Sequence, residues 1–339
     1  LMFFAIYRFV ADWTSSVEQR RLAWSLAVLG AGFGWVALAF GHTTPDILSV
    51  PEAFPLQAAY ANAHFPWAIA AAMLVAHVLV IKCAADEDAV PALDIETVGL
   101  AAASVFLATT SPFVLLPIGI GFGAMLAWLI WQRRELPRRE LAWGLVVLIF
   151  VFPFAAYSAW VMVVGNPAIA AWMEQNVTPS PPVWDYLIAF GPLLMLALPG
   201  IWASRRKMEA VDIFLLSWLV GGALLLYAPF SLQRRFTMGL IMPLAVYAGR
   251  GLWRVIIPKI TERRRGLVVA LTFALFMPTL VIALVGPMFA SLDMKQKDGG
   301  LYFLGRSELE AVKWLERNAR GAVVLASPEL SMYLPAYGL

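Results

Sequence analysis

Long apolar stretches dominate this sequence and restrict what it can fold into. Of its 339 residues, 61% are hydrophobic and only 14% are charged, and the mean hydropathy is +0.75. A water-soluble domain of this size does not need so much apolar surface. Crossing the hydrocarbon core of a bilayer takes about 20 apolar helical residues. Stretches of roughly that length lie at 23–40, 65–82, 113–131, 141–163, 186–203, 211–229, 236–256 and 266–287.

The apolar stretches are continuous and contain interior Gly and Pro, which is typical of transmembrane helices rather than of alternating barrel strands. Two shorter apolar pieces, 1–11 and 96–109, accompany them. The sequence therefore predicts an all-α polytopic membrane bundle of about 8–10 transmembrane helices over residues 1–290. Glycine triplets at 30–34 and 119–123 are expected inside these helices, where small residues let neighbouring backbones approach closely.

Lys and Arg are distributed unevenly over the connections. If 96–109 and 113–131 form a hairpin that turns at 110–112, seventeen Lys and Arg fall on one side of the membrane, and only Arg234 and Arg235 lie in short loops on the other. Positive residues favour the cytosolic side. The protein is therefore expected to be a multi-pass cell-membrane protein with loops 42–64 and 164–185 and the C-terminal segment exterior. The same clusters anchor helix ends, so the net charge of +3 does not indicate nucleic acid.

The C-terminal segment, 291–339, has a different pattern. A capping box at Ser307 and Glu310 predicts a helix at 308–318, the apolar run 322–326 predicts a buried strand, and Ser327-Pro328 predicts the start of another helix. This order is typical of a small soluble α/β domain. Because a lone strand needs partners, we expect that domain to be truncated here. We also expect further helices to precede the apolar first residues.

Arg234 and Arg235 are the clearest candidate site residues. Charged groups beside hydrocarbon cost on the order of 2.5–3.5 kcal/mol at a helix centre and less toward the interface. One interpretation is that both side chains reach the exterior headgroups. The other is that their planar guanidinium groups, together with Gln233, bind a lipid phosphate or diphosphate in a bidentate manner.

Loop 42–64 combines three prolines and several aromatic residues with polar side chains. One interpretation is that the loop lies along the membrane surface, with its aromatic residues at the interface. The alternative is that Glu52, Asn62 and His64 line a cavity that opens outward. The single cysteine, Cys83, rules out an internal disulfide framework, and the three histidines are too scattered for a metal-binding motif.

Several segments resemble members of the GT-C superfamily of polyprenyl-phosphate-dependent membrane glycosyltransferases, in particular uncharacterised bacterial proteins similar to the dolichyl-phosphate-mannose protein mannosyltransferases. The resemblance covers nearly the whole chain. It is carried by Pro51-Glu52-Ala53-Phe54-Pro55, Tyr60-Ala61-Asn62-Ala63-His64-Phe65, Gln233-Arg234-Arg235-Phe236, the helix beginning Ser307-Glu308-Leu309-Glu310, and Val323-Val324-Leu325-Ala326-Ser327.

The resemblance implies transfer of a sugar from a polyprenyl-phosphate donor to an acceptor on the exterior face. Arg234, Arg235 and Gln233 match the family's pattern of groups near the donor phosphate. The resemblance implies that the family's catalytic carboxylate lies in a first exterior loop, which we expect to precede Leu1, so Glu52, Asp46 and His64 are only substitute candidates. No metal ligands are assigned, and the need for a divalent metal is left open.

Two other functions fit the same sequence. The first alternative is a non-catalytic accessory or scaffold subunit of a larger membrane complex. The second is a transporter of lipid-linked intermediates. In each case the expected partner is a membrane lipid, joined in the first case by other membrane subunits. Neither function requires a carboxylate beside the phosphate site, which separates both of them from sugar transfer.

Overall fold

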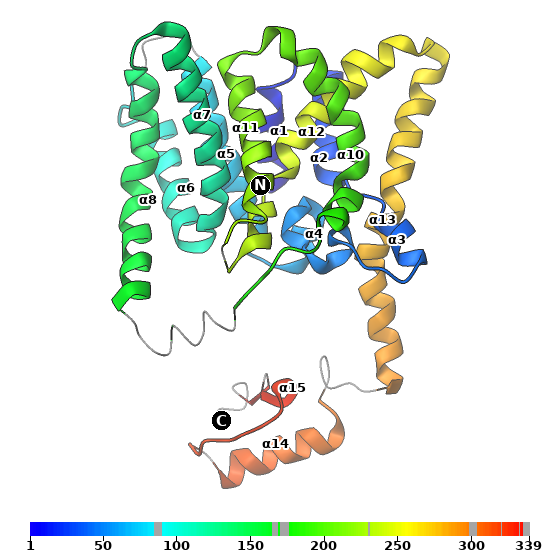
Figure 1. Cartoon of the computed structure of the whole chain (residues 1–339). Helices are drawn as coiled ribbons and strands as arrows, with labels where there is room; N and C mark the ends of the chain where they lie inside the picture. Colours follow the sequence, from blue (N-terminus) through cyan, green and yellow to red (C-terminus); the bar gives the residue numbers. More distant parts are fainter. Residues whose placement is uncertain are drawn as a thin grey trace. The chain divides into compact units, whose positions relative to one another are not determined.

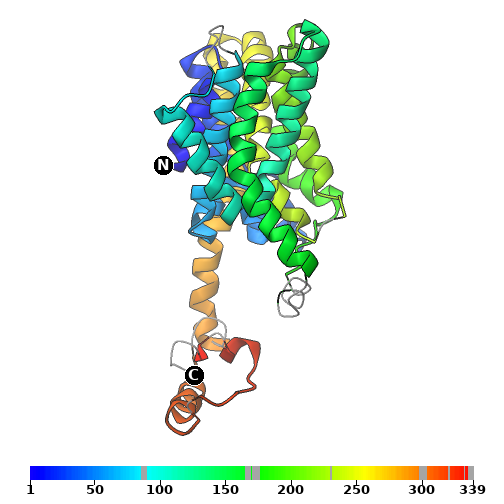
Figure 2. The ribbon, with the colours of Figure 1, turned by 90° about the vertical axis from the view of Figure 1, so that its left-hand side faces the viewer.

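The computed structural model describes residues 1–84, 90–164, 169, 176–229, 231–297, 304–319, 321–331 and 333–334. The chain divides into two compact units, Leu1–Ala283 and Leu284–Leu339. Within the first unit the helices run side by side, as Figures 1 and 2 show from two directions. The described residues contain no β-strand.

The first unit consists of long helices joined by turns and short 3-10 or π-helical pieces (η). In chain order they are α1 (Met2–Ala11), α2 (Val17–Leu29), α3 (Gly34–Ala39), η1 (Pro45–Ser49), η2 (Pro51–Ala53), α4 (Pro55–Ala61), α5 (Phe65–Ala84), α6 (Ile95–Thr110), η3 (Pro112–Val114), α7 (Leu115–Arg133), α8 (Arg138–Val164), α10 (Val183–Ser204), η4 (Arg205–Lys207), α11 (Ala210–Leu225), η5 (Gln233–Thr237), α12 (Ile241–Arg250), η6 (Gly251–Ile256), η7 (Ile257–Lys259) and α13 (Glu262–Lys297), which continues into the second unit.

Seven stretches of the described residues are long and apolar enough to cross a membrane. They are Val17–Ala39, Phe65–Cys83, Pro112–Arg133, Arg138–Val161, Val183–Lys207, Gln233–Lys259 and Glu262–Phe289. The remaining stretch expected from the sequence, 211–229, forms the shorter helix α11 of 16 residues. Helices α1 and α6 are also short and apolar. The predicted all-α helical bundle is therefore confirmed, with seven stretches of the described residues long and apolar enough to cross a membrane.

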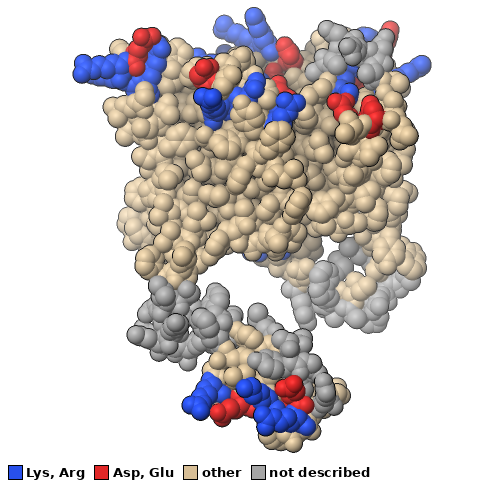
Figure 3. Space-filling model, turned by 180° about the vertical axis from the view of Figure 1, so that it is seen from behind, with Lys and Arg blue, Asp and Glu red and all other residues tan. Residues whose placement is uncertain are grey.

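Charge is concentrated at one end of the first unit, as Figure 3 shows. We call this the basic end; it comprises the α1–α2 and α7–α8 turns, η4, and η6 with η7. Helix α11 starts beside η4 and leads to η5, so Arg234 and Arg235 lie at the opposite end. The expected turn at 110–112 is present, because α6 ends at Thr110 and η3 begins at Pro112. Helix α12 is central and every one of its residues is buried.

The first glycine triplet interrupts a helix instead of lying inside one. Helix α2 ends at Leu29 and α3 begins at Gly34. A Cβ on Gly32 would lie 2.2 Å from the Ala189 carbonyl oxygen, so the expected close backbone approach does occur here. The backbone N–H and C=O groups that the break leaves without helical partners must be hydrogen-bonded by other parts of the protein. Those partners are distant in the sequence, so the sequence pattern does not predict the break.

The C-terminal unit contains α14 (Arg306–Asn318) and the short α15 (Pro328–Ser331). The expected helix at 308–318 is thus confirmed, but it begins at Arg306, and Glu308 accepts a hydrogen bond from the Gly305 N–H at the cap in place of the expected pair Ser307 and Glu310. The expected strand at 322–326 does not form, and Val323 and Leu325 are fully exposed. The prediction of an α/β domain is therefore not supported, because no second strand lies among the described residues to pair with this segment.

Candidate functional site

Two segments far apart in the sequence bring a carboxylate to the paired arginines. The Glu52 Oε1 atom lies 3.6 Å from Arg234 Nε and 3.6 Å from Arg235 Nη1. The Glu52 side chain is only 1% exposed, whereas those of Arg234 and Arg235 are 33% and 25% exposed. The cluster therefore joins a buried anion to two cations that remain partly exposed.

The fold holds the two parts of this cluster independently. Glu52 lies in η2, and its neighbours Ala53 and Phe54 are part of the apolar core, which fixes the backbone that carries the carboxylate. The two arginines lie in η5, between α11 and α12. Arg234 also donates from Nη1 to the Ser49 carbonyl at 3.3 Å, a contact between residues 185 positions apart in the sequence.

The segment that begins at Asn176 packs against η5 and the residues just before it. The Thr178 N–H donates to the Ser231 carbonyl at 2.8 Å, and the Arg234 N–H donates to the Thr178 carbonyl at 3.2 Å. The Arg235 guanidinium lies over the Phe65 ring, 5.6 Å from its centroid. Sequence reasoning missed Ser49, Thr178 and Phe65, and apart from the neighbouring polar motifs nothing in their residue types indicates these contacts.

The cluster has unused hydrogen-bonding capacity. Glu52 Oε1 and Arg234 Nε are both buried and make no hydrogen bond, since 3.6 Å exceeds hydrogen-bond length. Buried polar atoms are normally paired, and those that are not point to strain, to function or to a missing ligand. An oxyanion placed between the guanidinium groups would complete their hydrogen bonds, because paired Arg groups match phosphate oxygens.

Gln233 contacts the neighbouring backbone instead of Glu52. Its Nε2 donates to the Ala228 carbonyl at 2.8 Å, and its Oε1 accepts from the Ser180 N–H at 3.1 Å. Tyr227 adds a hydrogen bond to the Pro181 carbonyl at 2.8 Å. These contacts use both ends of the Gln233 amide, so we assign Gln233 to positioning the loop and not to contact with a phosphate.

Asp46 supports the helix break between α2 and α3. Its buried carboxylate accepts hydrogen bonds from the N–H groups of Gly32 at 2.8 Å and Gly34 at 3.1 Å, and from the Thr44 hydroxyl at 2.5 Å. Burial raises the pKa of this carboxyl, by more than the hydrogen bonds from Thr44 and the two glycines lower it. Both carboxylate oxygens of Asp46 accept hydrogen bonds from the protein and are buried, so neither is accessible to a substrate.

Replacing Asp46 with Ala should destabilise the fold. The change leaves two buried N–H groups without an acceptor, which costs about 1–3 kcal/mol for each group. Asp46→Asn keeps one oxygen acceptor and should lose less. Denaturant unfolding of both variants in detergent micelles measures the difference. Equal stability of the Ala variant and the original chain would contradict this structural role.

His64, the third candidate in loop 42–64, is exposed, and its ring packs against Phe65 at a centroid distance of 4.6 Å. Of the three candidate residues in this loop, only Glu52 reaches the arginines. The loop also does not lie flat on a surface, because Val50, Ala53, Phe54 and Ala58 enter the core. Of loop 164–185, residues 165–168 and 170–175 are outside the described residues.

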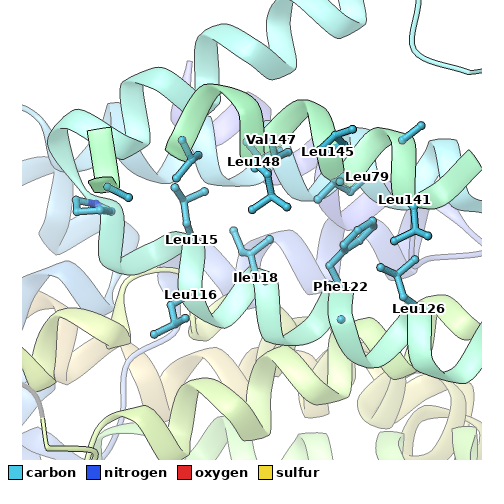
Figure 4. Close-up of a pocket in the computed structure, with 18 of the residues that line it drawn as sticks. Leu79, Leu115, Leu116, Ile118, Phe122, Leu126, Leu141, Leu145, Val147 and Leu148 are labelled. Atoms are coloured by element: carbon cyan, nitrogen blue, oxygen red, sulfur yellow. The ribbon is translucent and has the colours of Figure 1, made fainter. Parts of the chain in front are cut away.

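An apolar groove of about 820 Å³ runs between α7 and α8 (Figure 4). Figure 4 shows Ile118 and Phe122 of α7 and Leu145 and Leu148 of α8 pointing into it. The groove begins at Pro112 in η3, and η3 packs against η5. It therefore starts next to the segment that carries the arginine pair.

No cluster of three or more His, Cys, Asp or Glu side chains that could hold a metal ion occurs in the described part of the chain. Comparison of the sequence with protein-family models and curated proteins, and of the structure with solved structures, gave no match. The cluster of Glu52, Arg234 and Arg235 is therefore interpreted from its own geometry.

Proposed function

We propose that this chain is a membrane glycosyltransferase that moves a sugar from a polyprenyl-phosphate donor to an acceptor on the exterior face, as its resemblance to the GT-C superfamily implies. One observation carries the proposal: a buried carboxylate, Glu52, lies 3.6 Å from both members of an arginine pair. A scaffold or a lipid transporter needs the arginines but not the carboxylate.

The arginine pair supplies the phosphate-binding half of the proposed site. Guanidinium groups bind phosphate oxygens in a bidentate manner and stabilise the charge that develops on a leaving phosphate. In the absence of donor, Glu52 acts as their counter-ion. A donor phosphate would take its place and release the carboxylate toward the acceptor.

The groove between α7 and α8 supplies the place for the prenyl chain. It is lined almost wholly by apolar side chains and begins at η3, which packs against η5. A donor with its phosphate on Arg234 and Arg235 would therefore have an apolar surface close by for its first isoprene units.

The proposed step balances without a cofactor. The acceptor oxygen attacks the anomeric carbon, and the bond from that carbon to the phosphate oxygen breaks. Glu52 takes the acceptor's proton as general base. Polyprenyl phosphate leaves on Arg234 and Arg235, which neutralise its charge.

Changing both arginines to Gln should weaken binding of polyprenyl phosphate at least about ten-fold, because charge-assisted hydrogen bonds are worth about 1.5–3 kcal/mol each. Binding of the parent polyprenol, which has no phosphate, should not change. Both affinities are measured by titrating the purified chain in detergent and following tryptophan fluorescence. Unchanged binding of the phosphate form would refute the proposal.

The double Gln variant leaves Glu52 buried without a cation, which can destabilise the fold and reduce binding indirectly. A second double variant controls for this effect. The double variant Arg234→Lys with Arg235→Lys keeps both charges but replaces each planar guanidinium group with an ammonium, which cannot bind phosphate oxygens in a bidentate manner. Its affinity should lie between those of the original chain and the Gln variant. The thermal unfolding midpoint of each variant reports whether the fold is intact.

A further inference from the structure

A polar cavity of about 630 Å³ lies at the basic end of the bundle. Its walls come from the turn between α1 and α2, the end of α10 with η4, the start of α11, and α12 with η6. Arg250 in this cavity and Arg235 in the candidate site are at opposite ends of the span Gln233–Lys259. The cavity is therefore separate from the candidate site, and ligand binding in it is independent of the proposed function.

The floor of the cavity is a buried ion pair. Arg250 Nη1 lies 2.5 Å from Asp212 Oδ1, and their side chains are 10% and 9% exposed. The same guanidinium donates to the Trp13 carbonyl at 3.3 and 3.4 Å and to Ser204 Oγ at 3.3 Å. Arg250 thus connects three helices and has its donors engaged.

The carboxylates that line the cavity also have partners. Asp212 is paired with Arg250, and Asp12 lies 2.6 Å from His77 Nδ1. The Glu209 side chain caps the first turn of α11. No carboxylate of the described residues lies within ion-pair distance of the three exposed cations that line the cavity, which are Arg206, Lys207 and Arg254.

We propose that this cavity binds a phosphate-bearing anion, with the phosphate held among Arg206, Lys207 and Arg254. Two guanidinium groups and an ammonium offer the donors and the charge that phosphate oxygens require. The volume exceeds that of a phosphate group alone and falls in the range of small-molecule sites, about 300–1,000 Å³. An anionic phospholipid headgroup and a water-soluble phosphate compound share this chemistry.

A matched pair of triple variants tests the site. The cavity variant is Arg206→Gln, Lys207→Gln and Arg254→Gln. The control is Lys259→Gln, Arg263→Gln and Arg264→Gln, which removes the same residue types from exposed positions in η7 and at the start of α13 without touching the cavity. Each protein is placed in nanodiscs of equal phosphatidylglycerol and phosphatidylcholine, and the lipid retained after extraction is counted by native mass spectrometry. Calorimetric titration with glycerol phosphate and inorganic phosphate forms the soluble arm.

The cavity variant should lose affinity about ten-fold or more, because it removes the charge-assisted hydrogen bonds to the phosphate, which are stronger than neutral ones. The control should change less than about two-fold. Loss of phosphatidylglycerol alone identifies a headgroup site, and loss of the soluble compounds identifies a soluble ligand. Equal losses in both triple variants, or no binding by the original chain in either arm, would overturn the proposal. If the cavity variant does not fold, R206Q, K207Q and R254Q are compared singly.

Discussion

Replacing Arg250 with Met is expected to lower the free energy of unfolding by about 3–5 kcal/mol, the usual cost of leaving one member of a buried ion pair without its partner. Asp212 would remain almost fully buried and lose its only ion-pair contact among the described residues. The hydrogen bonds from Arg250 to Trp13 and Ser204 would be lost as well. Titration with a denaturing detergent in mixed micelles, followed by circular dichroism, measures the change.

The double variant R250M with D212L is the informative control. Apolar residues of similar volume often replace a buried ion pair with little loss of stability, so the double variant should recover most of what the single variant loses. The exposed pair of Arg265 and Glu262 gives a second comparison, because R265Q breaks a pair that water screens. A double variant as unstable as R250M would show that the hydrogen bonds, and not the unpaired charge, dominate.

Hydropathy was enough to predict the long apolar helices, because about 20 apolar residues in a row have few alternatives to a helix in lipid. It could not predict the break between α2 and α3. The groups that satisfy the break come from elsewhere in the fold: the Phe33 N–H donates to the Ile188 carbonyl at 3.0 Å, and Thr279 Oγ1 donates to the Gly32 carbonyl at 2.7 Å. Breaks of this kind depend on tertiary contacts.

The candidate site was predicted in part. The sequence singled out Arg234 and Arg235 by charge in an apolar setting, and it named Glu52 as one of several polar residues in loop 42–64. It did not bring them together, because both lie in irregular segments whose approach is set by the packing of other helices. Asp46 and Gln233 looked equally suitable by residue type. Only their hydrogen bonds identify them as structural.

Glu52→Gln is expected to separate sugar transfer from donor binding. Removing the proposed general base should slow transfer by about 10²–10⁴-fold. Binding of polyprenyl phosphate should stay the same or become tighter, because the variant removes a negative charge that competes for the two guanidinium groups. Release of polyprenyl phosphate from polyprenyl-phosphate mannose, the donor class implied by the family resemblance, measures transfer.

Asp185→Asn is the matched control, since Asp185 is a buried carboxylate at the same end that pairs with His42 at 2.8 Å and does not contact the arginines. It should leave both transfer and binding close to those of the original chain. Transfer at the original rate in Glu52→Gln would show that Glu52 is only a counter-ion of the arginines. The geometry would then support phosphate binding alone, as in a scaffold or lipid transporter. Loss of phosphate binding in the same variant would mean that Glu52 acts by holding the arginines in position. Slow transfer with intact binding is the one result that requires a carboxylate acting on the acceptor.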